Sequence, residues 1–196
     1  MIRLLVAALL ALLAPPLAAA PRPAGLVRVR LETAEGAIVL ALEAKRAPKT
    51  TANFLAYVDQ HRFDGTSFYR SARSRRDPSL GFVQGGVQHS YKRLLPPVAH
   101  EPTSRTGLTH ADGTISMARN APGTAMGDFI ITLGPIPSMD ARGDFPGYAA
   151  FGHVVEGKAV LRRILAGATI ANAGSGVMRN QFLARPVRIV RAVRVR

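Results

Sequence analysis

The sequence contains neither cysteine nor tryptophan among its 196 residues. Without cysteine the chain can form no disulfide, and it can supply no thiolate to a nucleophilic reaction or to a zinc site. Acidic residues are also scarce, because 12 Asp and Glu stand against 26 Lys and Arg, which gives a formal net charge of +14. This excess favours acidic partners, nucleic acid and anionic lipid included, but charge alone does not determine a fold.

The motifs that mark common cofactor and nucleophile sites are missing as well. No Gly-x-Gly-x-x-Gly follows a predicted strand, and the sequence has no phosphate-binding loop and no Gly-x-Ser-x-Gly elbow. The five histidines show no spacing typical of metal ligands. They are His61, His89, His100, His110 and His153. We therefore expect neither a cofactor nor a metal ion.

The basic residues are distributed through predicted strands and loops rather than grouped with aromatic residues. Binding of single-stranded nucleic acid normally combines basic grooves with aromatic stacking platforms. The most basic stretch, residues 71–79, is polar and reads as a solvated loop. A nucleic-acid-binding protein remains the weakest alternative, and we expect no specific nucleic-acid partner.

The first twenty residues have the pattern of an export signal. Arg3 precedes an apolar run over residues 4–14, Pro15 and Pro16 end that run, and small residues at 18–20 suit a cleavage site. The alternative is an uncleaved membrane anchor, although the run is short for a bilayer. We expect residues 1–20 to be a signal peptide and the protein to be exported to the periplasm, without stable membrane insertion after cleavage.

Residues 21–25 read as a linker and residues 26–196 as one domain, in which strand patterns dominate. Alternation of apolar and polar residues predicts an opening hairpin, and apolar spacing of three and four predicts two amphipathic helices. We predict a mainly β fold, a closed antiparallel β-barrel capped by two α-helices. The predicted strands cover residues 27–32, 37–42, 68–70, 82–83, 114–118, 129–133, 148–155 and 187–195, and the helices run from Pro48 to near His61 and around 160–165.

Two short apolar runs each end in a polar side chain. Arg70 follows Phe68 and Tyr69, and Gln84 follows Phe82 and Val83 before a Gly-Gly pair. If both runs pair in one sheet, a guanidinium and a carboxamide lie side by side above aromatic rings. Such a surface could hold an apolar ring and hydrogen-bond the amide next to it. The alternative is an arginine at the end of an exposed strand with a glutamine at its rim.

The order of these motifs resembles that of the cyclophilins, β-barrel peptidyl-prolyl cis–trans isomerases. The resemblance runs from about Val27 to the C-terminus and rests on five segments in the family's order. It implies an enzyme that accelerates rotation about X–Pro bonds and assists the folding of exported proteins. The segments are Pro48-Lys-Thr-Thr-Ala-Asn-Phe54, Gly65-Thr-Ser-Phe-Tyr-Arg70, Phe82-Val-Gln-Gly-Gly86, Gly113-Thr-Ile-Ser-Met-Ala118 and Phe151-Gly-His-Val-Val155.

The resemblance also implies roles for particular residues. Arg70 takes the place of the catalytic arginine, and Gln84 would orient Arg70 or the substrate carbonyl. The implied substrate-binding residues supply the proline pocket, its wall and the path of the substrate backbone. They are Phe82, Ala118, Arg119, Asp128, Phe129, Ile130, Met139 and Tyr148. The implied partners are proline-containing segments of unfolded or folding proteins, bound by a monomer.

Several positions depart from the family pattern. Gly81 stands where the family has its pocket phenylalanine, with Leu80 or Phe82 as the alternatives for that role, and Ile130 replaces a second one. Asp128 replaces a glutamine, Ser138 falls near the usual tryptophan, and Tyr148 replaces a histidine. Loss of aromatic area weakens the grip on proline. A weakly active or inactive cyclophilin-like module or chaperone that binds proline segments therefore stays open as the alternative.

Overall fold

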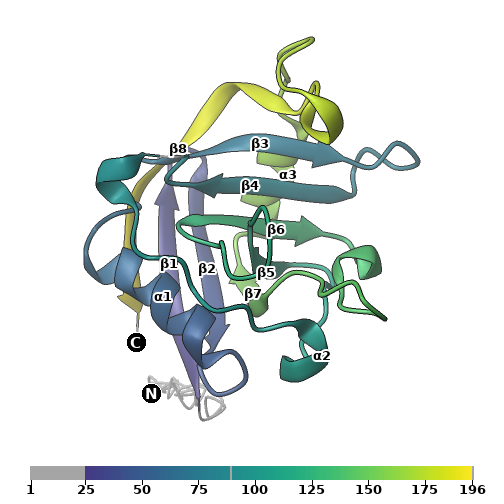
Figure 1. The fold of residues 1–196 in the computed structure, drawn as a ribbon. Coiled ribbons are helices and arrows are strands. Elements are labelled where there is room, and N and C mark those ends of the chain that lie inside the picture. The colour runs from purple at the N-terminus through teal and green to yellow at the C-terminus, as the bar shows by residue number, and fades with distance from the viewer. Residues whose placement is uncertain (1–24, 89, 196) are drawn as a thin grey trace, which may run out of the picture.

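A computed structural model describes residues 25–88 and 90–195, and eight strands form a closed antiparallel barrel (Figure 1). Around the barrel the order is β1-β2-β7-β5-β6-β4-β3-β8. The mainly β prediction and the closed barrel are both confirmed. The strands are β1 Leu26–Thr33, β2 Gly36–Glu43, β3 Ser67–Arg73, β4 Gly81–Gly86, β5 Thr114–Met117, β6 Asp128–Leu133, β7 Ala150–Glu156 and β8 Phe182–Val195.

The opening hairpin forms as the alternation predicts, with β1 and β2 paired from Leu26 opposite Glu43 to Thr33 opposite Gly36. The last strand closes the barrel, because β8 pairs with both β1 and β3. It begins at Phe182, five residues before the predicted start at 187, and includes Pro186. Proline cannot donate to a ladder and is tolerated at irregular points of a strand, and the β3–β8 register shifts beside Pro186.

Two longer helices, α1 Pro48–Asp59 and α3 Lys158–Ala166, bury apolar faces against the barrel, as predicted. Helix α1 packs against β2 and β8, and α3 packs against β2, β3 and β4, behind β3 and β4 in Figure 1. A third helix, α2 Thr103–Thr106, was not predicted. It is a single turn, too short to show helical periodicity, and Gly107 ends it in the left-handed conformation at φ 68°. Single-turn 3₁₀ helices occur at Tyr91–Arg93, Pro137–Met139 and Gly176–Met178.

Helix α1 is capped from a distance. Its N-cap residue Ala47 offers no side-chain hydrogen bond. Instead, the buried carboxylate of Glu101 accepts hydrogen bonds from the backbone N–H of Lys49 at 3.1 Å and of Thr50 at 2.7 Å. The Thr50 hydroxyl donates a third bond, also at 2.7 Å. A carboxylate at a helix N-terminus satisfies free N–H groups and complements the helix dipole.

An aromatic cluster fills the barrel. The rings of Phe54 on α1 and Phe129 on β6 meet edge to face with centroids 5.4 Å apart. Phe129 makes similar contacts with Phe63 at 5.5 Å and Phe68 at 5.7 Å. These side chains are fully or almost fully buried. Rings of this size dominate core energetics, so the cluster fixes how β3, β6 and α1 pack together.

The predicted signal peptide and most of the predicted linker lie outside the described residues. Among the residues that the structure describes, no helix is long and apolar enough to cross a membrane.

Candidate active site

Strands β3 and β4 bring the two polar side chains of the sequence analysis together. Arg70 and Gln84 are register partners, next to a bulge between Phe68 and Arg70. The Arg70 Nη1 donates a hydrogen bond to Gln84 Oε1 at 2.7 Å. A bulge rotates the side chains that follow it. The guanidinium and the carboxamide therefore share the outer face of the barrel.

The ring of Phe82 lies beneath this guanidinium, with Arg70 Cζ 5.1 Å from the ring centroid. This is cation–π geometry, which holds the flat group against the strand. Phe82 was predicted to form the proline pocket, and the structure places its ring against Arg70. Gly81 next to it has φ 141°, and an added Cβ would lie 2.1 Å from the Ala72 carbonyl oxygen. Position 81 can therefore carry no phenylalanine.

A second glutamine holds Arg70 from the other side. Gln181 Oε1 accepts hydrogen bonds from Arg70 Nε at 2.8 Å and from Arg70 Nη2 at 2.6 Å. Gln181 was not predicted as a site residue, because it is 111 residues from Arg70 and belongs to no recognisable motif. Only the pairing of β3 with the start of β8 brings the two residues together.

Gln84 continues the hydrogen-bond chain inward. Its Nε2 donates to the hydroxyl of Tyr69 at 2.7 Å, and this hydroxyl also lies beside the carboxylate of Asp128. Burial, reinforced by the negative charge of Asp128, raises the pKa of the Tyr69 phenol far above its usual value. Tyr69 therefore stays a neutral phenol, and the orientation of the Gln84 carboxamide is fixed at both ends.

The electrostatics of the site centre on Arg70. Burial lowers the pKa of its guanidinium, and the nearby Tyr69 and Tyr148 oppose this shift. An arginine nevertheless stays charged at any physiological pH. The partners Gln84 and Gln181 are neutral, so they fix the guanidinium without cancelling its charge. The positive charge remains available to a bound group.

On strand β6 the neighbouring candidates Phe129 and Ile130 point to opposite faces of the barrel. Ile130 is the register partner of both Gln84 and Ser116 and lies outside the barrel core cluster. Phe129 belongs to that core and is 0% exposed. Successive side chains of a strand point to opposite faces, so the outer face receives Ile130. The placement of Phe129 in the pocket wall is corrected: its ring lies inside the barrel.

The remaining candidates form a rim beside this face. The Arg119 guanidinium lies over the Tyr148 ring, with Cζ 4.7 Å from the centroid, and donates to the Gly147 carbonyl. The backbone N–H of Tyr148 donates to the Met139 carbonyl at 2.9 Å. The backbone N–H of Ala118 donates to the carbonyl of Asp128 at 2.9 Å, so that donor is occupied. Ser138 is exposed.

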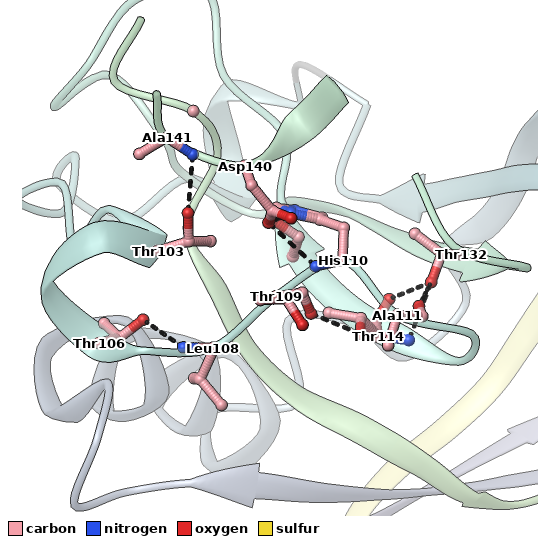
Figure 2. A network of polar contacts seen from close by, with 12 residues as sticks. Thr103, Thr106, Leu108, Thr109, His110, Ala111, Thr114, Thr132, Asp140 and Ala141 are labelled. Carbon is pink, nitrogen blue, oxygen red and sulfur yellow. Dashed lines mark hydrogen bonds and ion pairs between the residues drawn. The ribbon is translucent and has the colours of Figure 1, made fainter. Parts of the chain in front are cut away.

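A polar network anchors the loop that carries Met139 (Figure 2). Asp140 Oδ1 accepts hydrogen bonds from the His110 backbone N–H at 3.0 Å and from His110 Nδ1 at 2.6 Å. The other ring nitrogen of His110 lies 2.9 Å from the hydroxyl of Ser116. This is a Ser-His-Asp sequence of contacts, but Ser116 is 0% exposed and cannot meet a substrate. The network ties the Met139 loop to β5.

The comparisons with known proteins agree with this geometry. The sequence model of the family described as "Cyclophilin type peptidyl-prolyl cis-trans isomerase/CLD" matches residues 28–194. The chain belongs to the cyclophilin-type peptidyl-prolyl isomerase family. It is 37% identical over 140 residues to peptidyl-prolyl cis-trans isomerase cyp18 of Streptomyces antibioticus, which covers 69% of this chain and 81% of that protein.

Two further proteins are similar to this cyclophilin. It is 36% identical to peptidyl-prolyl cis-trans isomerase A of Dickeya dadantii, over 69% of this chain and 70% of that protein. A crystal structure of a cyclophilin-type isomerase from Cryptosporidium parvum superimposes with a TM-score of 0.63 at 20% identity. That match covers 87% of this chain and 98% of the other, and it shows the shared fold. The same protein was also crystallised in the presence of the dipeptide Ala-Pro.

Proposed function

We propose that this cyclophilin accelerates cis–trans rotation about X–Pro bonds and that Arg70 is its catalytic residue. The observation that carries the proposal is a charged guanidinium held on the outer face by two neutral acceptors, Gln84 and Gln181. Part of its hydrogen-bonding capacity is left for a substrate, because an arginine has more N–H groups than these contacts use. Ile130 and the rim at Tyr148 and Met139 border the same face.

Rotation about an X–Pro bond requires neither a nucleophile nor a base. The barrier to X–Pro rotation is roughly 18–20 kcal/mol, because rotation breaks the amide resonance. The twisted nitrogen becomes pyramidal and more basic, so a fixed cationic donor stabilises the twisted amide more than either planar form. Only such differential binding increases the rate. The positions of Arg70 and Gln84 suit this role.

A second candidate function is the binding of proline segments with little turnover. The observation in its favour is the reduced aromatic area: position 81 carries no side chain, and Phe82 lies against Arg70. Ile130 is the buried residue at the place of a family phenylalanine. With less aromatic surface the proline ring is held less firmly, so its amide is less well placed against Arg70 and turnover is low.

The experiment is a protease-coupled assay on proline peptides with wild type, Arg70→Ala and Arg70→Lys. One charge-assisted hydrogen bond contributes about 1.5–3 kcal/mol, and tenfold in rate corresponds to about 1.4 kcal/mol. Arg70→Ala should therefore lose about one to two orders of magnitude in kcat/KM. Arg70→Lys should recover only part, because an ammonium lacks the planar fork.

The matched control is Arg73→Ala, which removes an exposed arginine from the same strand. It should keep the wild-type rate, and thermal melts should show that all three variants are folded. If wild type is active and Arg70→Ala keeps its full rate, the catalytic role of Arg70 is wrong. If wild type binds proline peptides without accelerating rotation, the binding module is the correct function.

We also propose that this isomerase acts on exported proteins in the periplasm. The support is the sequence pattern of residues 1–20, with Arg3, the apolar run and the small residues at 18–20. Cell fractionation and N-terminal sequencing test the proposal. We expect a mature N-terminus after Ala20; a cytoplasmic protein that retains Met1 would contradict it.

A further inference from the structure

The segment between α3 and β8 reaches the candidate active site through one side chain. In Figure 1 this segment lies above β3, where the chain turns into β8. Gln181, its last residue, accepts two hydrogen bonds from Arg70, at 2.8 Å from Nε and 2.6 Å from Nη2. One carbonyl oxygen thus engages a whole edge of the guanidinium. This contact is separate from the Arg70–Gln84 pair.

The backbone of Gln181 is itself fixed. Its carbonyl accepts a hydrogen bond from the Ser71 N–H on β3 at 2.9 Å, and its N–H donates to the Met178 carbonyl at 3.2 Å. The next residue, Phe182, stacks on Tyr69 with ring centroids 6.4 Å apart and planes at 17°. A side chain on a backbone that is held on both sides is a good positioning group, because few of its rotamers remain.

We propose that Gln181 is a positioning residue for Arg70, which holds the guanidinium at the angle that the twisted amide requires. Gln84 and Gln181 hold different nitrogens, so removal of either lets the group rotate about its long side chain. An arginine side chain carries considerable rotamer entropy, and misplacement by about 1 Å can cost on the order of a hundredfold in rate. The carboxamide is neutral, so it does not offset the positive charge of Arg70, whereas a carboxylate at this position would.

The kinetic part of this inference rests on the proposed isomerase function. The test variant is Gln181→Met, which keeps the length of the side chain and removes the acceptor. We expect kcat to fall at least about tenfold with little change in KM, because Arg70 loses both of its hydrogen bonds to Gln181 Oε1. In an Arg70→Ala background the same change should have no further effect, because Gln181 acts only through Arg70.

The matched control is Gln60→Met. Gln60 is an exposed glutamine that accepts a hydrogen bond from Arg62 Nε at 2.8 Å, so the same chemical change is made at a surface glutamine–arginine pair. It should leave kcat unchanged. A purely structural role for Gln181 would lower the melting temperature and would reduce the rate equally in both backgrounds.

A second readout does not depend on activity. In ¹⁵N NMR spectra the Nε–H of Arg70, assigned by its loss in Arg70→Ala, should exchange slowly with water in wild type and in Gln60→Met. It should exchange faster in Gln181→Met. An unchanged Arg70 signal in Gln181→Met overturns the proposal, as does a full rate in that variant or an equal loss in the Arg70→Ala background. If wild type shows no isomerisation, the proposed function fails, and the NMR comparison alone decides the role of Gln181.

Discussion

Replacement of Phe129 by leucine should separate the core of the barrel from its outer face. The Phe129 ring is fully buried and meets three other phenylalanine rings, with centroids 5.4 to 5.7 Å apart. Truncation of a buried Phe to Ala costs about 3–5 kcal/mol. Leucine fills most of that volume but loses the three ring contacts, so we expect a destabilisation of about 2 kcal/mol. At roughly 2–4 °C per kcal/mol, the melting temperature should fall by about 4–8 °C.

The isomerisation rate should depend on Ile130, the next residue, and not on Phe129. At a temperature where both variants are folded, Phe129→Leu should keep the wild-type kcat/KM. Ile130→Ala should lose about tenfold or more, because each methylene missing from an apolar pocket costs about 1–3 kcal/mol. Differential scanning calorimetry and the peptide assay measure the two effects. The reasoning fails if Phe129→Leu raises KM as much as Ile130→Ala does, since the ring would then line the pocket.

Two further predictions concern the supports of the fold. Glu101→Gln should lower the free energy of unfolding by about 2 kcal/mol, because the carboxylate caps α1 through Lys49 and Thr50. The control Glu32→Gln, in a surface pair with Arg30 at 3.7 Å, should change the free energy of unfolding by less than about 1 kcal/mol. Calorimetry measures both, and equal shifts would contradict the capping role. Burial lowers the pKa of His110 below its ordinary value of about 6.5, so its contribution to stability is complete above that pH and is lost as pH falls further. Urea titrations at pH 7.5 and 5.5 should show a smaller loss for His110→Gln than for wild type, and equal losses would refute this.

The sequence predicted the barrel well because its strands carry strong local signals. The alternation over residues 27–32 and 37–42 depends only on which side chains face the core, and the hairpin forms accordingly. Helix α2 and the early start of β8 escaped prediction for local reasons. One turn shows no periodicity, and Pro186 interrupts a strand that tertiary pairing nevertheless continues.

The site residues that lie in recognisable local motifs were predictable from the sequence. The residue that only strand pairing brings to the site was not. Arg70 and Gln84 stood at the ends of two runs that proved to be neighbours. Gln181 carries no motif and reaches Arg70 only through the β3–β8 contact. The resemblance placed both Phe129 and its neighbour Ile130 in the pocket and its wall, whereas successive side chains of a strand point to opposite faces, and the Phe129 ring is buried in the core.

Catalysis of X–Pro rotation by Arg70 can be measured by NMR exchange spectroscopy on a proline peptide at equilibrium, with catalytic amounts of the protein. Uncatalysed X–Pro exchange takes tens of seconds or more and is too slow for exchange peaks. We expect exchange peaks between the cis and trans forms with wild type and with Arg73→Ala, and a strong loss of these peaks with Arg70→Ala. Peptide resonances that shift on binding to wild type without any exchange peaks would show that the protein binds proline segments and does not catalyse their rotation.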